Sequence, residues 1–328
     1  MDRVPSIDLN PFLSGSNRQR VVDEVRNACE TLGFLVVAGH SLSPELLQRA
    51  FAEARDFFDL PQENKLRASP PVKGRQRGYH GMASRNLGKT LGLDVPADLR
   101  ESLFLGPIDD CRGYYANTPE AAESYAPNVL PEQPDGFADT LRELYRGFER
   151  LSADLLRIFA LALDLPEMWF ADKMGRHFSV MSVHHYPPLT EQPLPGQLRT
   201  GAHTDFGALT ILAMTGATTG LEVLGADETW LPVTAGPGEL VINLGDMMAR
   251  WTNNRWASTI HRVTNPPVAN LAASRRQSIG YFMHPNYDAM ISCIPSCLAA
   301  GATPRFADIT AGAHIRMKIE ASHKATAA

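Results

Sequence analysis

Residues 201–212 read GAHTDFGALTIL, which places a histidine, His203, two residues before an aspartate, Asp205. The apolar run at 209–214, LTILAM, follows directly and predicts a β-strand. On a strand, residues i and i+2 point to the same face, so the imidazole and the carboxylate would project side by side. Such a pair suits a metal ion, and it equally suits a simple hydrogen bond. Residues elsewhere in the chain decide between these interpretations.

A third candidate metal ligand, His261, lies at the end of another predicted strand, at 258–263. Two histidines and one carboxylate can occupy one face of an octahedral metal, as in non-haem Fe(II) enzymes, and they leave open positions for substrates and O₂. A structural zinc site would instead fill every position with protein ligands. The sequence therefore predicts an iron site at His203, Asp205 and His261.

Arg276 and Ser278 form a second polar pair at i and i+2, on the predicted strand at 277–282 and the residue before it. A guanidinium binds a carboxylate through two parallel hydrogen bonds, and a hydroxyl adds a further donor. We therefore expect an anion to be anchored there, with its other end toward the metal. Tyr186 supplies another hydroxyl from an earlier strand. Arg275 competes for the anchoring role, but only Arg276 lies two residues before Ser278.

Composition excludes several classes of protein. The chain has 328 residues, of which 44% are hydrophobic and 20% charged, and its net charge of −5 argues against a nucleic-acid partner. No apolar run reaches the roughly 18 residues of a membrane span, and the first residues lack the apolar core of a signal peptide. Four scattered cysteines are too few for a disulfide scaffold. We expect a cytoplasmic protein, and the sequence gives no indication of its oligomeric state.

The pattern along the chain predicts a mainly β protein with flanking helices. Helical spacing is present at 20–32, 43–58 and 136–163, whereas short apolar runs between turn signals follow one another from 179 to 282. Such runs suggest an antiparallel sandwich or barrel with the N-terminal helices packed outside it. We expect four regions: an N-terminal region of strands, helices and loops (1–110), a helical linker and support (111–175), the β core (176–290) and a C-terminal segment near the entrance of the site (291–328).

Taken together and in order, the motifs resemble one known family, the 2-oxoglutarate- and Fe(II)-dependent oxygenases of the isopenicillin N synthase type. The triad, the downstream HRV and the RxS pair carry most of this resemblance. The matching segments of the core are HYPP (185–188), GAHTDFGALTIL (201–212), GLEVL (220–224), NLGDMMARWTNNRWASTIHRV (243–263) and RRQSIGYFMHPN (275–286). The N-terminal segments are VPSIDL (4–9), GFLVVAGH (33–40), FFDLPQENK (57–65) and RGYHG (77–81).

The resemblance implies a double-stranded β-helix, or jelly roll, in which His203, Asp205 and His261 bind Fe(II). It implies that Arg276 and Ser278, helped by Tyr186, hold the distal carboxylate of the co-substrate 2-oxoglutarate. The implied reaction uses O₂ to oxidise a C–H bond of a small-molecule metabolite, such as one of secondary metabolism, with release of succinate and CO₂. Hydroxylation is expected first, with desaturation or ring closure as other outcomes, and no catalytic residue is expected beyond the iron ligands.

Two other functions stay open at this point. Some members of the family use the RxS pair to hold the carboxylate of the substrate itself, and these oxidases or cyclases need no 2-oxoglutarate. A non-enzymatic binding or sensing module on the same barrel is a further alternative. The intact triad argues against such a module, because a binding protein has no need of open iron sites.

Several residues have two interpretations. Phe206, Met248, Trp251 and Tyr79 either form walls of the substrate pocket or pack in the core. His184 and His185 stand where the family often has Asn and Tyr; they alternate faces, and their roles stay open. Glu101 is expected to support loop structure, and Asp246 to orient the loop before His261.

A loose basic segment lies around the RGYHG motif. Its members are Lys73, Arg75, Arg77, Arg85 and Lys89. A solvated basic face is one interpretation, and capture of an anionic substrate is the other.

Overall fold

The largest sheet carries apolar side chains on both faces, because alternate residues of its strands point in opposite directions. In β10, Leu240 and Ile242 pack into one hydrophobic cluster, whereas Val241 packs into another. The computed structural model describes residues 3–72, 75–215 and 220–327. Within them, the eight strands of this sheet are, in spatial order, β1 (Ser6–Asp8), β2 (Phe34–Ala38), β10 (Leu240–Leu244), β7 (Leu209–Met214), β12 (Arg276–Met283), β5 (Val180–Tyr186), β4 (Glu101–Leu105) and β3 (Gly78–His80).

A smaller sheet packs against one face of the large sheet. Val223 and Val263 of the small sheet share a buried cluster with Val36 and Val241 of the large one. Neighbouring strands are antiparallel except for β1 and β2. Two antiparallel sheets around a shared core form the predicted jelly roll. The small sheet has the order β6 (Thr200–His203), β11 (His261–Val263), β8 (Leu221–Leu224) and β9 (Trp230–Pro232), and a separate hairpin is formed by β13 (Met290–Ile291) and β14 (Ile309–Thr310).

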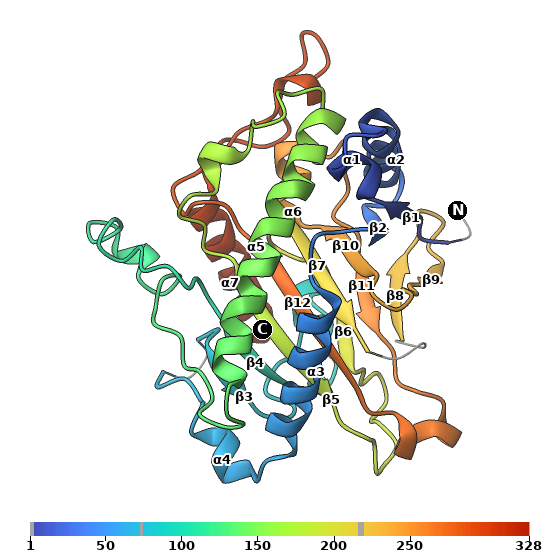
Figure 1. Cartoon of the computed structure of the whole chain (residues 1–328), viewed down its shortest axis with the longest axis vertical. Helices are drawn as coiled ribbons and strands as arrows, with labels where there is room; N and C mark the ends of the chain where they lie inside the picture. Colours follow the sequence, from blue (N-terminus) through green and yellow to red (C-terminus); the bar gives the residue numbers. More distant parts are fainter. Residues whose placement is uncertain (1–2, 73–74, 216–219, 328) are drawn as a thin grey trace.

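Helices cover the other face of the large sheet. The longest helix, α5, crosses the front of the sheet beside α3, with α1 and α2 next to its far end (Figure 1). The α-helices are α1 (Asn10–Leu13), α2 (Arg18–Thr31), α3 (Pro44–Asp59), α4 (Gln62–Leu66), α5 (Phe137–Ala162), α6 (Asp246–Trp251) and α7 (Ala311–Ala327). The short 3₁₀ helices are η1 (Gly88–Leu91), η2 (Pro119–Ala121), η3 (Ala171–Lys173), η4 (Val268–Ala273) and η5 (Pro295–Cys297). None of the helices in the described ranges combines the length and the apolar character that crossing a membrane requires.

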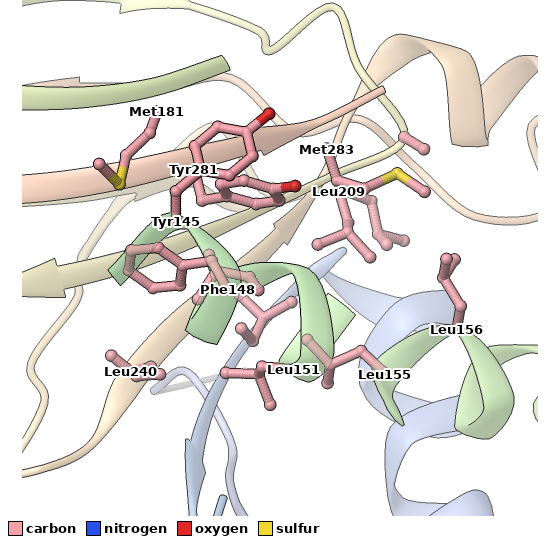
Figure 2. Packing of buried hydrophobic residues seen from close by; sticks show 14 of the residues in the cluster. Tyr145, Phe148, Leu151, Leu155, Leu156, Met181, Leu209, Leu240, Tyr281 and Met283 are labelled. Carbon is pink, nitrogen blue, oxygen red and sulfur yellow. The ribbon is translucent and has the colours of Figure 1, made fainter. Parts of the chain in front are cut away.

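The contact between α5 and the sheet forms the main core. Figure 2 shows the apolar face of α5 directed at β5, β7 and β12. The ring of Tyr281 on β12 contacts both Tyr145 and Phe148, with centroid distances of 5.2 and 5.5 Å. Leu151, one turn further along α5, is completely buried in the same cluster. The buried positions of α5 recur every three or four residues, which is why one face of the helix meets the sheet.

Two predicted elements differ from the structure. The strand expected at 258–263 is shorter, because β11 begins only at His261. Ile260 still accepts a hydrogen bond from the amide of Leu224 in β8, but the hydroxyl of Thr259 donates to the carbonyl of Leu32. The apolar pattern does not reveal the short strand β6, since its sequence TGAH has no apolar run, and β6 ends at His203 although the i, i+2 spacing predicts a strand that includes Asp205. The structure therefore moves the strand boundaries next to two of the candidate metal ligands.

Replacement of Leu151 by Ala tests the importance of the α5 contact. The substitution leaves a cavity in a close-packed cluster, so it should lower the free energy of unfolding by about 2–5 kcal/mol in urea denaturation. Leu194, whose side chain is 60% exposed, is the matched control. Leu194→Ala should change the free energy by less than about 0.5 kcal/mol. Equal effects of the two substitutions would contradict the assigned core.

Candidate metal centre

Two histidines meet across neighbouring strands of the small sheet. β6 and β11 pair so that His203 lies directly opposite His261, and their ring centroids are 4.3 Å apart. Residues directly opposite on antiparallel strands bring their side chains together, so this register alone places two imidazoles at one point. His261 also contacts Phe34 of the large sheet at 5.2 Å, which shows that the pair faces the space between the sheets.

The carboxylate of Asp205 reaches the same point from a turn. The sequence predicts that Asp205 shares a strand with His203, but β6 ends at His203, and Asp205 lies in the connection to β7. Backbone amides at the start of α6 hold this connection: the N–H of Asp246 donates to the carbonyl of Asp205 (2.7 Å) and that of Met247 to the carbonyl of Gly207 (3.0 Å). This turn therefore positions Asp205, whereas the sequence predicts that the alternation of side chains along a strand does so.

The three side chains form a compact donor set. Oδ1 of Asp205 lies 3.7 Å from Nε2 of His203 and 3.9 Å from Nε2 of His261. The candidate ligand atoms of all three residues lie within 4.8 Å of one another. Metal–ligand bonds of about 2.0–2.2 Å allow two ligand atoms of one ion to lie up to about 4.4 Å apart, so Oδ1 and both Nε2 atoms are within reach of a single ion. Two imidazoles and one carboxylate are also the donor types of a facial iron triad.

Hydrogen bonds define which nitrogen of each histidine faces the metal position. Nδ1 of His203 lies 2.8 Å from the carbonyl oxygen of Gly201, and Nδ1 of His261 lies 3.1 Å from that of Thr259. A carbonyl only accepts, so Nδ1 carries the proton in both rings and Nε2 keeps its lone pair for a metal. Burial, and then the neighbouring His261, lower the pKa of His203 to about 3. The His203 imidazole is therefore neutral, as a metal ligand must be.

The carboxylate of Asp205 is oriented in the same way. Its Oδ2 accepts hydrogen bonds from Oγ1 of Thr210 (2.6 Å) and from Nδ2 of Asn243 (2.7 Å). Burial favours the neutral carboxyl, but the two histidines and these hydrogen bonds outweigh it and lower the pKa of Asp205. The group is ionised, with Oδ1 directed toward the imidazoles. Sequence reasoning missed Thr210 and Asn243, which are paired across β7 and β10.

The predicted anion-binding residues lie on the facing sheet. Arg276 pairs with Tyr186 across β12 and β5, and Ser278 pairs with His184. The guanidinium of Arg276 lies 4.4 Å from the ring centroid of Tyr186. Burial favours the neutral phenol of Tyr186, but Arg276 and then Arg100 outweigh it and lower its pKa. The surroundings of this group are therefore strongly positive.

Arg275 points elsewhere. Its guanidinium forms an ion pair with Asp59 at the end of α3, at 2.9 Å. Arg276 and Ser278 thus share one face of β12, whereas the neighbouring arginine is bound at the surface.

His184 and His185 point to opposite faces of β5, as their alternation predicts, and both are buried. His184 faces the space between the sheets and is bonded to Ser102 and Ser182, each at 2.8 Å. Burial and then the charges of Arg100 and Arg85 lower its pKa well below the usual value. His185 instead faces the helical layer.

Glu101 is the centre of a buried polar network in that layer. Its carboxylate contacts Nδ1 of His185 at 2.8 Å and Nζ of Lys65 at 2.9 Å, and it accepts a hydrogen bond from the hydroxyl of Tyr79. Each partner comes from a different element, so Glu101 ties them together. The prediction of a structural role agrees with this position.

A cavity of about 760 Å³ of empty space adjoins the triad. Of the four predicted pocket residues, Phe206 lines it. Met248 and Trp251 are instead buried in the main hydrophobic cluster, where Trp251 contacts Phe170 at 5.4 Å, and Tyr79 is buried beside Glu101. These three positions are predicted from their proximity in sequence to the family motifs, whereas their side chains point into the core.

Other cavity residues are not among the predicted ones. Arg100 comes from the start of β4, His284 follows β12, and Ile315 and Ile319 come from α7. Only contacts between distant segments reveal these residues.

Asp246, expected to orient the loop before His261, bonds Thr204 at 3.2 Å and forms an ion pair with Lys318 of α7. It therefore links the turn that carries Asp205 to the helix that borders the cavity.

Of the residues in the basic segment, Arg85 lines the cavity, and Lys73 lies outside the described residues.

Comparison with known proteins identifies the chain. Residues 4–133 match the model of the N-terminal domain of a non-haem dioxygenase in morphine synthesis, and residues 177–285 match the 2OG-Fe(II) oxygenase superfamily. The chain belongs to the 2-oxoglutarate- and Fe(II)-dependent oxygenases. Its cofactor is therefore Fe(II), and its co-substrates are 2-oxoglutarate and O₂. The family resemblance found in the sequence is confirmed.

Individual relatives support this assignment over nearly the whole length of this oxygenase. The 2-oxoglutarate-Fe(II) type oxidoreductase hxnY of Emericella nidulans is 33% identical over 315 residues, covering 93% of this chain and 86% of that protein. A structure of a 2OG-Fe(II) oxygenase family protein from Caulobacter crescentus superposes with a TM-score of 0.82 at 30% identity, over 98% and 99% of the two chains. A full-length Neurospora crassa protein, crystallised in complex with alpha-KG, gives a TM-score of 0.84 at 26% identity, over 99% and 96%.

Thr210→Val tests the orientation of Asp205. The substitution keeps the shape of the side chain but removes the hydrogen bond to Oδ2. It should weaken Fe(II) binding about 10- to 100-fold, the usual effect of losing a group that orients a metal ligand. Anaerobic metal titration measures this change. Thr234→Val, at an exposed position, is the matched control and should bind Fe(II) normally; unchanged binding by Thr210→Val would contradict the orienting role.

Proposed function

We propose that Nε2 of His203, Oδ1 of Asp205 and Nε2 of His261 bind Fe(II) on one face of the metal. The observation that carries this proposal is that each of the three side chains has its other polar atom in a hydrogen bond within the protein. The remaining atoms converge on one point beside the cavity. Three protein ligands leave the opposite face open for co-substrate, substrate and O₂.

Arg276 and Ser278 bind the distal carboxylate of 2-oxoglutarate in this proposal, with the hydroxyl of Tyr186 beside them. All three face the space between the sheets, and His184, the cross-strand partner of Ser278, lines the cavity next to His203. A guanidinium in a mostly apolar enclosure is a strong partner for a carboxylate. The two sheets would thus set an anion site and a metal site facing one another.

When bound, iron and 2-oxoglutarate supply the oxidising chemistry, in which O₂ is consumed, 2-oxoglutarate becomes succinate and CO₂, and a substrate C–H bond is oxidised. The protein's own residues bind, orient and exclude water. The neutral imidazole of His203 and the ionised carboxylate of Asp205 offer lone pairs without first losing a proton. No side chain is required as a general base for removal of hydrogen from carbon. We infer hydroxylation of a small-molecule metabolite as the outcome.

The C-terminal segment, 291–328, borders the substrate cavity in this proposal. Ile315 and Ile319 of α7 form part of the cavity wall, and Lys318 between them pairs with Asp246. Apolar side chains at the entrance exclude water from the site. Relatives of the chain act on several different small molecules, as the name proline hydroxylase buaE from Petromyces alliaceus illustrates.

Asp205→Ala tests the metal site. Loss of a direct ligand should weaken Fe(II) binding by more than about 100-fold, because loss of an outer partner already costs 10- to 100-fold. Succinate release should fall with it. Asp227, exposed in a surface turn, is the matched control, and Asp227→Ala should bind iron like the parent protein. Full Fe(II) binding by Asp205→Ala would refute the triad.

Arg276→Gln and Arg275→Gln together test the co-substrate site. Loss of a charge-assisted hydrogen bond costs about 1.5–3 kcal/mol, so Arg276→Gln should raise the dissociation constant of 2-oxoglutarate roughly 10- to 100-fold. Arg275→Gln, which removes a surface ion pair, should leave that constant within about twofold. Calorimetry with metal-loaded protein measures both, and Fe(II) binding should persist in both. A larger loss in Arg275→Gln would transfer the anchoring role to Arg275.

A further inference from the structure

The cavity contains two arginines that the metal and the co-substrate do not use. Arg85 and Arg100 line the same cavity as His203 and Asp205. The guanidinium of Arg85 lies 4.5 Å from the ring centroid of Phe104, and its Nε is buried without a hydrogen-bond partner. Across the described residues, Arg85 has no side-chain hydrogen bond or ion pair. A partly buried guanidinium without an ion pair is costly, so its presence in the cavity requires an explanation.

Arg100 is only partly neutralised. One of its N–H groups lies 3.2 Å from Nε2 of His184, and another lies 3.5 Å from Oδ2 of Asp98. Asp98 also accepts from the backbone amides of Gly201 (3.0 Å) and Leu87 (3.4 Å). One carboxylate therefore serves the guanidinium of Arg100 and two backbone amides.

When iron and 2-oxoglutarate are counted as bound, the charged groups of the site leave an excess of positive charge. The guanidiniums of Arg85, Arg100 and Arg276 together with Fe(II) carry five positive charges. The carboxylates of Asp98 and Asp205 and the 2-oxoglutarate dianion carry four negative charges. Among these groups one positive charge remains after metal and co-substrate are bound, and Arg85, although it feels the charge of Asp98, forms no ion pair with it in the described chain.

Apolar side chains form a large part of the remaining wall of the cavity, alongside the polar side chains of Gln76, Thr90 and Thr204. Phe104, Val180, Phe206 and Phe282 form its walls, and Ile315 and Ile319 of α7 complete them. A ligand that satisfies both features has an apolar body and one anionic group. Arg85 stacks on Phe104, so its fork is held at one wall while its donors stay available.

We propose that the substrate of this oxygenase is a monocarboxylic acid with an apolar body, whose carboxylate is bound by Arg85 with Arg100 beside it. The inference rests on the proposed function, because it places the oxidised carbon at the metal end of the same cavity. Arg276 binds the co-substrate and Arg85 binds the substrate, so two arginines select two different acids. The basic segment of the sequence thus includes a specificity-determining residue.

Matched acids and amides test this proposal. The probes are octanoate, 4-phenylbutyrate, 3-phenylpropionate and indole-3-acetate, each paired with its primary amide. Calorimetry is performed without oxygen on protein saturated with Fe(II) and 2-oxoglutarate, and succinate release is measured separately in air. At least one acid should bind roughly 10- to 100-fold more tightly than its amide, the value of one charge-assisted contact. Failure of every acid to bind, or equal binding of acids and amides, overturns the proposal.

Substitutions of Arg85 then test whether this residue causes the preference for acids over amides. Arg85→Gln should abolish the acid–amide difference while the dissociation constant of 2-oxoglutarate stays within about twofold, and Arg85→Lys should retain part of it. Arg112→Gln, at an exposed arginine paired with Asp110, is the matched control and should preserve the difference. Removal of an unpaired buried charge should not lower the melting temperature, so loss of folding is not expected.

Two further results separate this proposal from the proposed function. If Arg85→Gln weakens the binding of 2-oxoglutarate and leaves the preference for acids over amides intact, Arg85 belongs to the co-substrate site and the proposal is overturned. If the parent protein binds neither Fe(II) nor 2-oxoglutarate, the proposed function itself fails. Acid binding that disappears in Arg85→Gln supports the proposal whether or not a probe is oxidised.

Discussion

The direction of three lone pairs is the constraint on which the site depends. Each candidate ligand has two polar atoms, and in each the protein binds one of them: carbonyls bind Nδ1 of His203 and His261, and two side chains bind Oδ2 of Asp205. A carbonyl cannot donate, so it forces the proton onto Nδ1. The other three atoms then face one another without hydrogens between them. In a dry enclosure, such an arrangement is unfavourable until a cation enters, so the affinity for the metal is built into the fold.

The two sheets supply this arrangement from different sides. The small sheet brings His203 and His261 together through strand register, and β7 and β10 of the large sheet bring Thr210 and Asn243 to Asp205. The large sheet also carries the Arg276 and Ser278 pair, one strand away. Packing of α5 against the opposite face of the large sheet therefore supports the strands that carry these residues, although none of its side chains contacts the metal ligands. A shift of one residue in the β7–β10 register would turn Asn243 away from Asp205.

Much of the fold could be predicted because its long elements have clear periods. The helix expected at 136–163 is α5 (Phe137–Ala162), and the strand expected at 209–214 is β7. The apolar pattern did not reveal the short strand β6, and the strand expected at 258–263 is reduced to β11, since three or four residues carry no clear period. The triad and the RxS pair were recognisable because their spacing is local. Asn243 was not, because it reaches Asp205 only through pairing of β10 with β7, which no local pattern encodes. Thr210 is close in sequence, but only the turn before β7 shows that its hydroxyl reaches Asp205.

Arg77 and Arg85 are two arginines of the basic segment whose different roles also could not be predicted from the sequence. Both are arginines in a loop without periodicity, and sequence reasoning treats them alike. Arg77 is buried and donates to the carbonyls of Ser124 and Ala126, so its charge is dispersed over backbone oxygens. Arg85 has an aromatic ring beneath it and an apolar cavity in front of it. A carbonyl-bound arginine holds loops together, whereas an arginine without an acceptor in a cavity favours an anion from outside. The difference in function between the two lies in their acceptors, and only the folded chain determines where those acceptors are.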